Sequence, residues 1–195
     1  MLGFFKQMLG LLQLSKKPVI QIRQWEPKDI PSIYIMEKMQ HEEGEPDPIE
    51  AENLVQWMRS EYMHGIILTE NEIVRGYAII LTSQVQCIVR ALRVDKEHRR
   101  HGYGTKILKH ILRGLIAWNK TYIQIDISEK NTGARKFLMK EDKSGFVIVI
   151  MSEFTDPEGD YIEAFYEMQY PPPPGFNPKR DLRFFVNGEE KPKRS

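Results

Sequence analysis

Apolar and polar positions follow two different periods along the chain, and these periods predict strands and helices in alternation. Apolar residues at every second position, or in short unbroken runs, predict strands at 19–23, 65–69, 73–81, 85–94, 122–127 and 161–168. Two helices are expected in the first third of the chain. One opens at Pro27 and Asp29 and carries Ile33, Met36 and Glu37. The other follows the loop at 41–48 and runs through Leu54, Val55, Met58 and Tyr62.

The most regular amphipathic run begins near Thr105 and predicts a further helix. Its apolar residues recur at helical spacing, at Ile107, Leu108, Ile111, Leu112, Leu115 and Ile116. The basic residues fall off that face, at Lys106, Lys109 and Arg113. Because the preceding apolar run ends at Val94, we expect Gly102 and Gly104 to lie at a strand-to-helix turn.

This turn has the composition of an anion-binding site. The first N–H groups of a helix lack internal partners and carry partial positive charge. Gly102 and Gly104 have no Cβ, so a phosphate can approach the main chain closely. Arg99 and Arg100 add two permanent cations. The alternative is a solvated basic loop in which the glycines serve only geometry, and the dinucleotide fingerprint is incomplete because no third glycine follows near Leu108.

The apolar alternation changes phase in the strand before this turn. Apolar residues take odd positions first and even positions later, at Val85, Cys87, Val89, Leu92 and Val94. Because a strand alternates strictly, the change predicts one extra residue near Arg90 and Ala91, which is a β-bulge. The alternative is a strand that ends at Val89.

Length, charge and cysteine content narrow the possible classes of protein. The 195 residues suit one domain with one hydrophobic core. A formal net charge of +1 argues against nucleic-acid binding, which usually needs a strong basic excess. The single cysteine, Cys87, excludes an intrachain disulfide and fits a reducing, cytoplasmic location. Its apolar surroundings predict a buried thiol rather than a reactive one.

Composition divides the chain into three parts, 1–18, 19–170 and 171–195. The first is an apolar helical extension, and its residues 1–14 are too few to span a bilayer. We expect this segment to pack on the fold or on a partner rather than to lie in a membrane surface. A membrane-surface helix usually carries several basic residues on its polar face, and this segment has only Lys6. The last part holds a stiff run of prolines at 171–174, a short strand expected within 181–186 and a loose charged end at 189–195.

Two motifs in order resemble the GCN5-related N-acetyltransferases. The first resembles that family's acetyl-CoA pyrophosphate loop, with the spacing Arg99-x-x-Gly102-x-Gly104. The second resembles the family's next helix and strand, with Asn131-x-x-Ala134-x-x-Phe137 followed by Gly145-Phe146. The resemblance covers residues 19–170 and is closest to the branch that acetylates protein N-termini.

The resemblance implies a fold and a cofactor. The fold is an α/β (α+β) domain. Its central mixed sheet is mostly antiparallel, has about six to seven strands and is flanked by about four helices, and the bulged strand is splayed from the next. Acetyl-CoA is the implied acetyl donor, with pantetheine between the splayed strands, and no metal is implied. The implied cofactor-binding residues are Leu92, Arg93, Val94, Arg99, Arg100, His101, Gly102, Tyr103, Gly104, Thr105, Asn131, Ala134 and Phe137. Asn131 has the alternative role of capping the helix that it begins.

The resemblance also proposes catalytic groups. The N-terminal acetylating branch typically reads Leu-Glu-Val-Arg in the fifth strand, which puts Asp126 on the acidic position and Ser128 on the arginine. Asp126 is therefore the candidate base, with a purely structural polar residue as the alternative. The family often has a tyrosine acid where this chain has Leu138. Tyr161 and Tyr166 are possible substitutes, and the acid stays unassigned.

The implied reaction moves an acetyl group from acetyl-CoA to a primary amine. Protein N-termini lead as acceptors, ahead of lysine side chains and small amines. The family's connection between the first two helices borders the acceptor, and here residues 41–48 carry four carboxylates. Such a loop fits either plain solvated surface or attraction of a cationic amine. The rival function is a non-catalytic acyl-CoA-binding or interaction module, which Leu138 favours.

Overall fold

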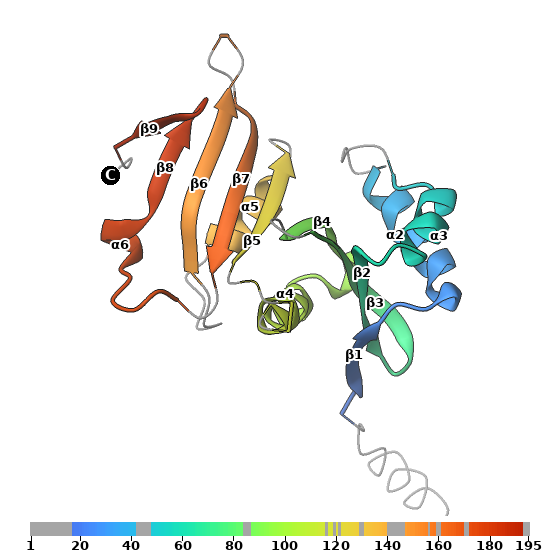
Figure 1. Cartoon of the computed structure of the whole chain (residues 1–195). Coiled ribbons are helices and arrows are strands. Elements are labelled where there is room, and N and C mark those ends of the chain that lie inside the picture. The colour runs from blue at the N-terminus through green and yellow to red at the C-terminus, as the bar shows by residue number, and fades with distance from the viewer. Residues whose placement is uncertain are drawn as a thin grey trace, which may run out of the picture.

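The strands form one open nine-stranded sheet in the order β1-β2-β3-β4-β5-β7-β6-β8-β9 (Figure 1). The structure is a computed structural model that describes residues 17–41, 48–83, 87–115, 117–118, 120, 122–128, 131–139, 147–155, 157–158, 161–169 and 172–192. The strands are β1 Ile20–Gln24, β2 Met63–Glu70, β3 Ile73–Thr82, β4 Cys87–Val94, β5 Tyr122–Ser128, β6 Val147–Thr155, β7 Tyr161–Gln169, β8 Arg183–Val186 and β9 Glu189–Lys191. Only the β4–β5 and β6–β8 pairs of this sheet are parallel, so the predicted mixed, mostly antiparallel sheet is confirmed.

Helices connect the strands of the first half and cover both sides of the sheet. In the described residues they are η1 Pro27–Asp29, α2 Ile30–His41, α3 Ala51–Met58, η2 Lys96–His98, α4 Tyr103–Gly114, α5 Thr132–Met139 and the short α6 Pro178–Asp181. Two expected boundaries were wrong. Helix α3 ends at Met58, so Tyr62 lies in an exposed turn, and α4 begins at Tyr103 because Gly102 serves as its N-cap.

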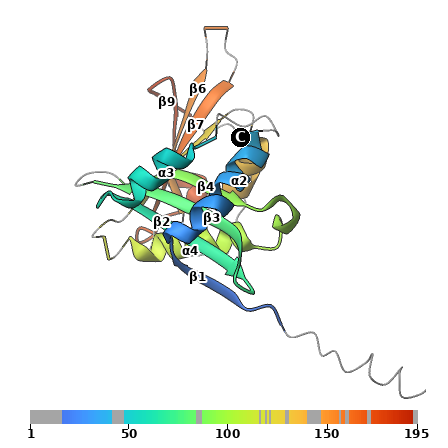
Figure 2. The same cartoon turned by 90° about the vertical axis from the view of Figure 1, so that its right-hand side faces the viewer.

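Each face of the sheet carries its own core. The larger core takes in the β5 isoleucines and the predicted apolar face of α4, at Ile107, Leu108, Ile111, Leu112 and Leu115. The smaller core joins the sheet to α2 and α3 around Ile33, Leu54 and Ile79. Figure 2 views the molecule from the side of α2 and α3, which lie in front of β2, β3 and β4. In Figure 1, α5 lies behind β5 and β7. The half of the sheet that holds β2, β3 and β4 is thus covered on both faces, by α4 on one and by α2 and α3 on the other.

The loop between β2 and β3 is a two-residue hairpin turn, because Glu70 pairs with Ile73. Asn71 and Glu72 have φ angles of 50° and 69°, the left-handed conformation that a two-residue type I′ turn needs at both positions. The Asn71 Oδ1 accepts a hydrogen bond from the Val19 N–H at 3.0 Å, which ties the start of β1 to this turn. The hairpin brings Glu70 beside Arg75, and both side chains reach the site described below.

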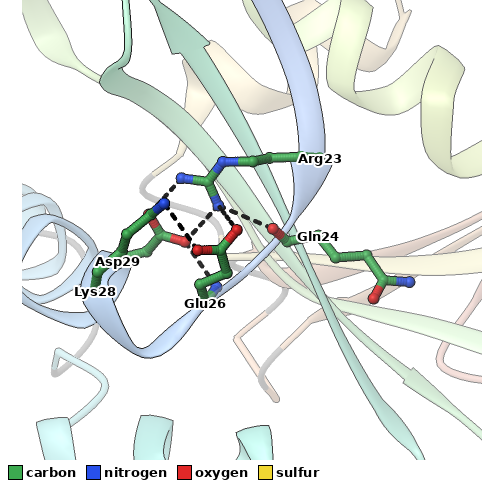
Figure 3. A network of polar contacts seen from close by, with 5 residues as sticks. All are labelled: Arg23, Gln24, Glu26, Lys28 and Asp29. Atoms are coloured by element: carbon green, nitrogen blue, oxygen red, sulfur yellow. Dashed lines mark hydrogen bonds and ion pairs between the residues drawn. The ribbon is translucent and has the colours of Figure 1, made fainter.

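A compact ionic motif fixes the entry into α2 (Figure 3). Asp29 is buried, and both of its oxygens accept hydrogen bonds from the Arg23 guanidinium at 2.7 Å. The Glu26 N–H donates a further bond to it at 2.7 Å. Burial favours the neutral acid, but these bonds to the charged form outweigh it and lower the pKa of Asp29. The predicted helix start at Pro27 and Asp29 is confirmed.

The C-terminal residues extend the sheet. The strand expected within 181–186 is confirmed as β8, which runs parallel to β6. The expected loose end was wrong for Glu189–Lys191, because these residues form β9 and pair antiparallel with β8. Asn187 and Gly188 make the intervening turn with φ angles of 48° and 83°. This hairpin extends the sheet beyond the number of strands expected.

In the part of the chain that the structure describes, no helix is long and apolar enough to cross a membrane. The apolar segment 1–14, most of the acidic loop at 41–48 and the Gly145-Phe146 pair lie outside the described residues.

Candidate functional site

Gly102 lies at the turn from β4 into α4, as predicted, whereas Gly104 lies in the first turn of α4 itself. Gly102 is the N-cap of α4 and has a φ of 80°, in the left-handed region that favours glycine. Arg100 also has a positive φ, 67°. No atom lies within 4 Å of the point where a Cβ on Gly102 would stand, so the main chain is open to approach there. The first N–H groups of α4 and the two left-handed residues thus make a surface suited to an anion.

The predicted cations of this turn are exposed. Arg99 and Arg100 both lie at the surface, and the Arg99 Nε donates to the Val94 main-chain oxygen at 3.3 Å. His101 is exposed, with its ring 6.4 Å from the rings of His98 and Tyr103. The turn therefore presents positive side chains beside the helix N-terminus, as the anion-site interpretation requires.

Glu70, at the end of β2, contacts residues on both sides of this turn. The Tyr103 hydroxyl donates a hydrogen bond to the Glu70 Oε1 at 2.7 Å, and the bond raises the pKa of Tyr103. The second oxygen of Glu70 lies 3.5 Å from the His98 Nε2 and 3.6 Å from the Arg75 Nε. One carboxylate thus contacts the residue before the turn and the first residue of α4.

Asp95 completes this support. It lies just after β4, where its carboxylate is 3.1 Å from the Arg75 Nη1 and 3.0 Å from the His98 Nδ1. Its main-chain N–H donates to the Arg75 oxygen at 2.9 Å. Arg75 therefore lies between Glu70 and Asp95, and the hairpin of β2 and β3 positions the loop by charged contacts. None of these residues was among the predicted site residues. In the sequence only Glu70 and Arg75 stand out, as charged residues on either side of the hairpin turn.

Three predicted cofactor-binding residues from three elements converge at Gly104. A Cβ on Gly104 would lie 3.5 Å from the Phe137 ring and 3.8 Å from the Leu92 Cδ2. Phe137 comes from α5, Leu92 from β4 and Gly104 from the first turn of α4. The first turn of α4 therefore lies close to α5 and β4, and the missing side chain of Gly104 allows this close approach. Two further predicted residues, Ala134 and Thr105, are half-buried.

The predicted β-bulge is present in β4. Ile79 of β3 pairs with Ala91 and Ile80 pairs with Val89, so Arg90 is the extra residue. The bulge changes which face the side chains occupy. Cys87 and Val89 lie in the larger core, Ala91 lies in the smaller one, and Leu92 and Val94 pack against the larger core again.

The strands β4 and β5 part immediately beyond the bulge. They pair in parallel only through Ile88 with Gln124 and Val89 with Ile125, within the residues that the structure describes. Both strands continue, β4 to Val94 and β5 to Ser128. The predicted splay is therefore observed, and it begins next to Asp126.

The backbone of Asp126 lies within β5, between two of the buried isoleucines of that strand. Ile123, Ile125 and Ile127 are all in the larger core, and the Asp126 backbone pairs with Phe165 of β7. The side chains of Asp126 and Ser128 lie outside what the structure describes. The backbone places Asp126 one position past the last residue of β5 that pairs with β4.

Asn131 makes the capping contact. Its Oδ1 accepts a hydrogen bond from the Ala134 N–H at 2.8 Å, at the start of α5. Further along α5, Leu138 is only 3 % exposed and packs in the larger core. The position where the family often has a tyrosine therefore faces apolar side chains.

Tyr166 is not placed to replace that tyrosine. It is fully buried, and its hydroxyl accepts a hydrogen bond from the Arg135 Nε at 3.2 Å. Arg135 also binds Glu153 on β6. Its burial and its bond to Arg135 argue against Tyr166 as the acid, which stays unassigned, and the Tyr161 side chain lies outside the described residues.

A second buried carboxylate joins the helical side to β4. Glu37 of α2 accepts hydrogen bonds from the Tyr77 hydroxyl and from the Arg93 Nε, the latter at 3.3 Å. It also accepts one from the Ile49 N–H at 3.1 Å. Burial first, then the adjacent Glu37 charge, raises the pKa of Tyr77 well above its usual value, so the phenol stays a donor. The Arg93 side chain thus points to α2, which leaves a main-chain contact as its way to bind a cofactor.

Glu37 was expected in this helix, but the sequence predicted no role for it. A signal was available, because this carboxylate shares the helical face of Ile33 and Met36. Its partners were not predictable in the same way, since the hydroxyl of Tyr77 comes from 40 positions away.

Comparisons with known proteins agree with this geometry. No curated protein sequence matches the chain. In fold it is similar to the ribosomal-protein-S18-alanine N-acetyltransferase of Escherichia coli (18% identity, TM-score 0.60, 77% of this chain and 93% of that one). Ard1 of Thermoplasma volcanium gives 22% identity and a TM-score of 0.58 over 76% of this chain and 95% of that one. The Salmonella typhimurium protein yncA, solved with its cofactor acetyl-CoA, gives 15% identity and a TM-score of 0.60 over 78% and 94%.

Identities this low establish a shared fold and leave the substrate open. The decisive match is a family model, because the model of the acetyltransferase (GNAT) family matches residues 28–146. That region contains α2, the bulged β4, the anion turn and α5. Enzymes of this family use acetyl-CoA as the acyl donor. The chain therefore belongs to the GNAT family of acetyltransferases.

Proposed function

We propose that this protein transfers an acetyl group from acetyl-CoA to a primary amine, and that protein N-termini are its acceptor class. The observation that carries the proposal is the parting of β4 from β5 at the bulge, beside the anion-binding turn that opens α4. A long ligand with a diphosphate at one end and a thioester at the other fits these two features together.

The residues of the site suit acetyl-CoA. The main chain of 99–105 and the exposed Arg99 and Arg100 would hold the diphosphate. Leu92, Gly104 and Phe137 would border the pantetheine, and Asn131 would approach it from the start of α5. Acetyl-CoA supplies, when bound, an activated acetyl thioester whose thiol is the leaving group.

The chemistry asked of the protein is modest. A main-chain N–H of the bulged strand donates a hydrogen bond to the thioester carbonyl oxygen. Asp126 accepts the proton that the acceptor nitrogen loses as the N–C bond forms and the C–S bond breaks. A thiol pKa of about 8.5 makes a thiolate a tolerable leaving group near neutral pH, so the apolar Leu138 does not prevent turnover.

The acceptor class rests on three points of support. The motif pattern is closest to the N-terminal acetylating branch, with Asp126 on the acidic position of β5. Two structures similar in fold carry the names of an alanine N-acetyltransferase and of Ard1. The acidic composition of 41–48 suits a cationic amine. Lysine side chains and small amines are the alternatives within the same reaction.

Turnover of acetyl-CoA by the full chain tests the proposal. Peptides with different first residues are compared with the same peptides blocked at the N-terminus, with a blocked peptide that contains lysine, and with a small polyamine. We expect thiol release and a mass gain of one acetyl group only with free N-termini. Acetylation of the blocked lysine peptide or the polyamine would contradict the acceptor class while keeping the reaction.

A second candidate function is a non-catalytic acyl-CoA-binding module. The specific observation in its favour is Leu138, which is buried among apolar residues where the family often has a tyrosine. Calorimetric binding of acetyl-CoA without thiol release in any peptide or amine reaction would establish this function and contradict the enzyme.

A further inference from the structure

We propose that Glu37 is a positioning residue for the amine acceptor, which holds the entry of α3 against the strand β4 just beyond the bulge. The inference rests on the proposed function and adds a residue that the reaction itself does not use. Its basis is one buried carboxylate that three separate segments share.

Glu37 is 3 % exposed and accepts from three donors. Its Oε1 accepts from the Tyr77 hydroxyl of β3 and from the Arg93 Nε of β4. Its Oε2 accepts from the Ile49 N–H, which lies just before the N-cap of α3. Because buried polar groups need partners, this carboxylate fixes the relative positions of α2, the α3 entry and the two strands.

These three partners lie where an acceptor must be oriented. Arg93 follows the bulge at Arg90 and lies in the part of β4 that has separated from β5. Ile49 ends the connection from α2 to α3, and Tyr34 of α2 adds a bond to Glu50 at 3.3 Å. The carboxylate therefore connects α2 and the start of α3 to β4, the strand beside which the thioester would lie. A shift of about 1 Å in such a wall is enough to lower productive binding.

The charge of Glu37 matters as well as its shape. All three partners are donors, so an amide in place of the carboxylate has only one acceptor oxygen for them. If that oxygen keeps Tyr77 and Arg93, the Ile49 N–H loses its acceptor; if it keeps Ile49, the buried Tyr77 hydroxyl loses its own. Glu37→Gln preserves volume and breaks the coupling, which makes it the informative change.

The chain offers a matched control in Asp29. It is also a buried carboxylate, 2 % exposed, and it binds an arginine and a main-chain N–H (Figure 3). Its partners Arg23 and Glu26 lie six and three positions away in sequence, so the motif is local to the start of α2. Loss of the Asp29 charge should lower stability without moving the α3 entry against β4.

The experiment compares Glu37→Gln, Tyr77→Phe and Asp29→Asn with the wild type. The acceptor is the free peptide that the wild-type protein acetylates fastest. For Glu37→Gln we expect the acceptor KM to rise about tenfold or more, while the acetyl-CoA Kd from calorimetry stays within about twofold. Tyr77→Phe should show a smaller rise, because one donor of three is removed. Asp29→Asn should lower the Tm and leave both constants within about twofold of wild type.

Each remaining outcome decides against the inference. An unchanged acceptor KM in a folded Glu37→Gln or Tyr77→Phe protein would overturn it, and so would an equal rise in Asp29→Asn. If Glu37→Gln does not fold, Tyr77→Phe carries the decision with the same readouts. A wild-type protein that acetylates no peptide would contradict the proposed function and this inference together, which separates that failure from a failure at Glu37 alone.

Discussion

The Tyr103 hydroxyl donates a hydrogen bond to the Glu70 Oε1 at 2.7 Å, and this bond ties the first residue of α4 to the end of β2. The two residues are 33 positions apart in sequence. The bond matters because the N–H groups at the start of α4 can bind a diphosphate well only if the start of the helix keeps one position relative to the sheet. The hairpin of β2 and β3 thus supports the turn that we propose to bind the diphosphate.

Removal of that bond should weaken acetyl-CoA binding. In Tyr103→Phe the ring stays packed, and Glu70 loses its hydroxyl donor, a bond to a charged group worth about 1.5–3 kcal/mol. We expect a lower Tm and a severalfold higher acetyl-CoA Kd by calorimetry, with little change in the acceptor KM. Tyr34→Phe, which removes a hydroxyl on the face of the sheet that α2 covers, is the control for the acetyl-CoA Kd alone. A Tyr103→Phe protein with wild-type Kd would show that the bond is only structural.

Substitutions at Gly102 should follow backbone conformation rather than side-chain size. The φ of 80° costs an ordinary residue about 1–2 kcal/mol, whereas asparagine tolerates it better. Gly102→Val should therefore lower stability and raise the acetyl-CoA Kd strongly, and Gly102→Asn should do so less. Thermal unfolding and calorimetry measure the two effects. Equal binding by both variants and the wild type would argue against a diphosphate at this turn.

Gly104 should respond to size, because its environment is different. An added Cβ would meet the Phe137 ring at 3.5 Å, an ordinary contact, so Gly104→Ala should fold and bind acetyl-CoA within a few-fold of wild type. The branched side chain of Gly104→Val extends further toward Phe137 and should raise the acetyl-CoA Kd about tenfold or more. Calorimetry on both proteins checks this order. Unchanged affinity in the valine variant would remove Gly104 from the cofactor site.

Asp126→Asn should lower kcat while the acetyl-CoA Kd holds. A general base contributes roughly 10²–10⁴-fold, so a loss in that range is expected. Higher pH should partly restore the rate, because more of the acceptor amine is then already neutral. Measurement of kcat against pH for both proteins, with the folded fraction checked, tests the role. A stable variant with full activity at pH 7 would exclude Asp126 from the reaction.

Alkaline pH should destabilise the protein through Cys87. Burial raises the pKa of this thiol to about 12, above its usual value of about 9. The folded state therefore keeps the proton when the unfolded chain has lost it. The thiol's contribution to stability is full below about pH 9 and is lost as the pH rises toward 12.

The comparison of Cys87→Ala with the wild type isolates this effect. The free energy of unfolding, from denaturant curves between about pH 8 and 10.5, should fall less steeply with pH in the variant. Parallel slopes in the two proteins would contradict a buried neutral thiol. Slow alkylation of the folded wild-type protein by iodoacetamide is expected from the same burial.

Local patterns in the sequence were enough to predict most elements of the fold. The isoleucines of β5 alternate and the apolar residues of α4 recur at helical spacing, and both sets are buried as predicted. The phase change near Arg90 predicted the bulge that the structure shows there, because side chains in a strand must alternate. The glycines predicted a strand-to-helix turn, and Gly102 is found there in the left-handed conformation that favours glycine.

Tertiary structure alone decided which charged groups support the site. Glu37 and Tyr77 are 40 positions apart, and Glu70 and Tyr103 are 33 apart, so no local period relates them. It also decided that β8 pairs with β6 in parallel and that Glu189–Lys191 joins the sheet, because strand partners depend on which edge is left open. The period of a sequence determines which face of an element is buried. Only the packed fold determines which distant donors a buried carboxylate meets there.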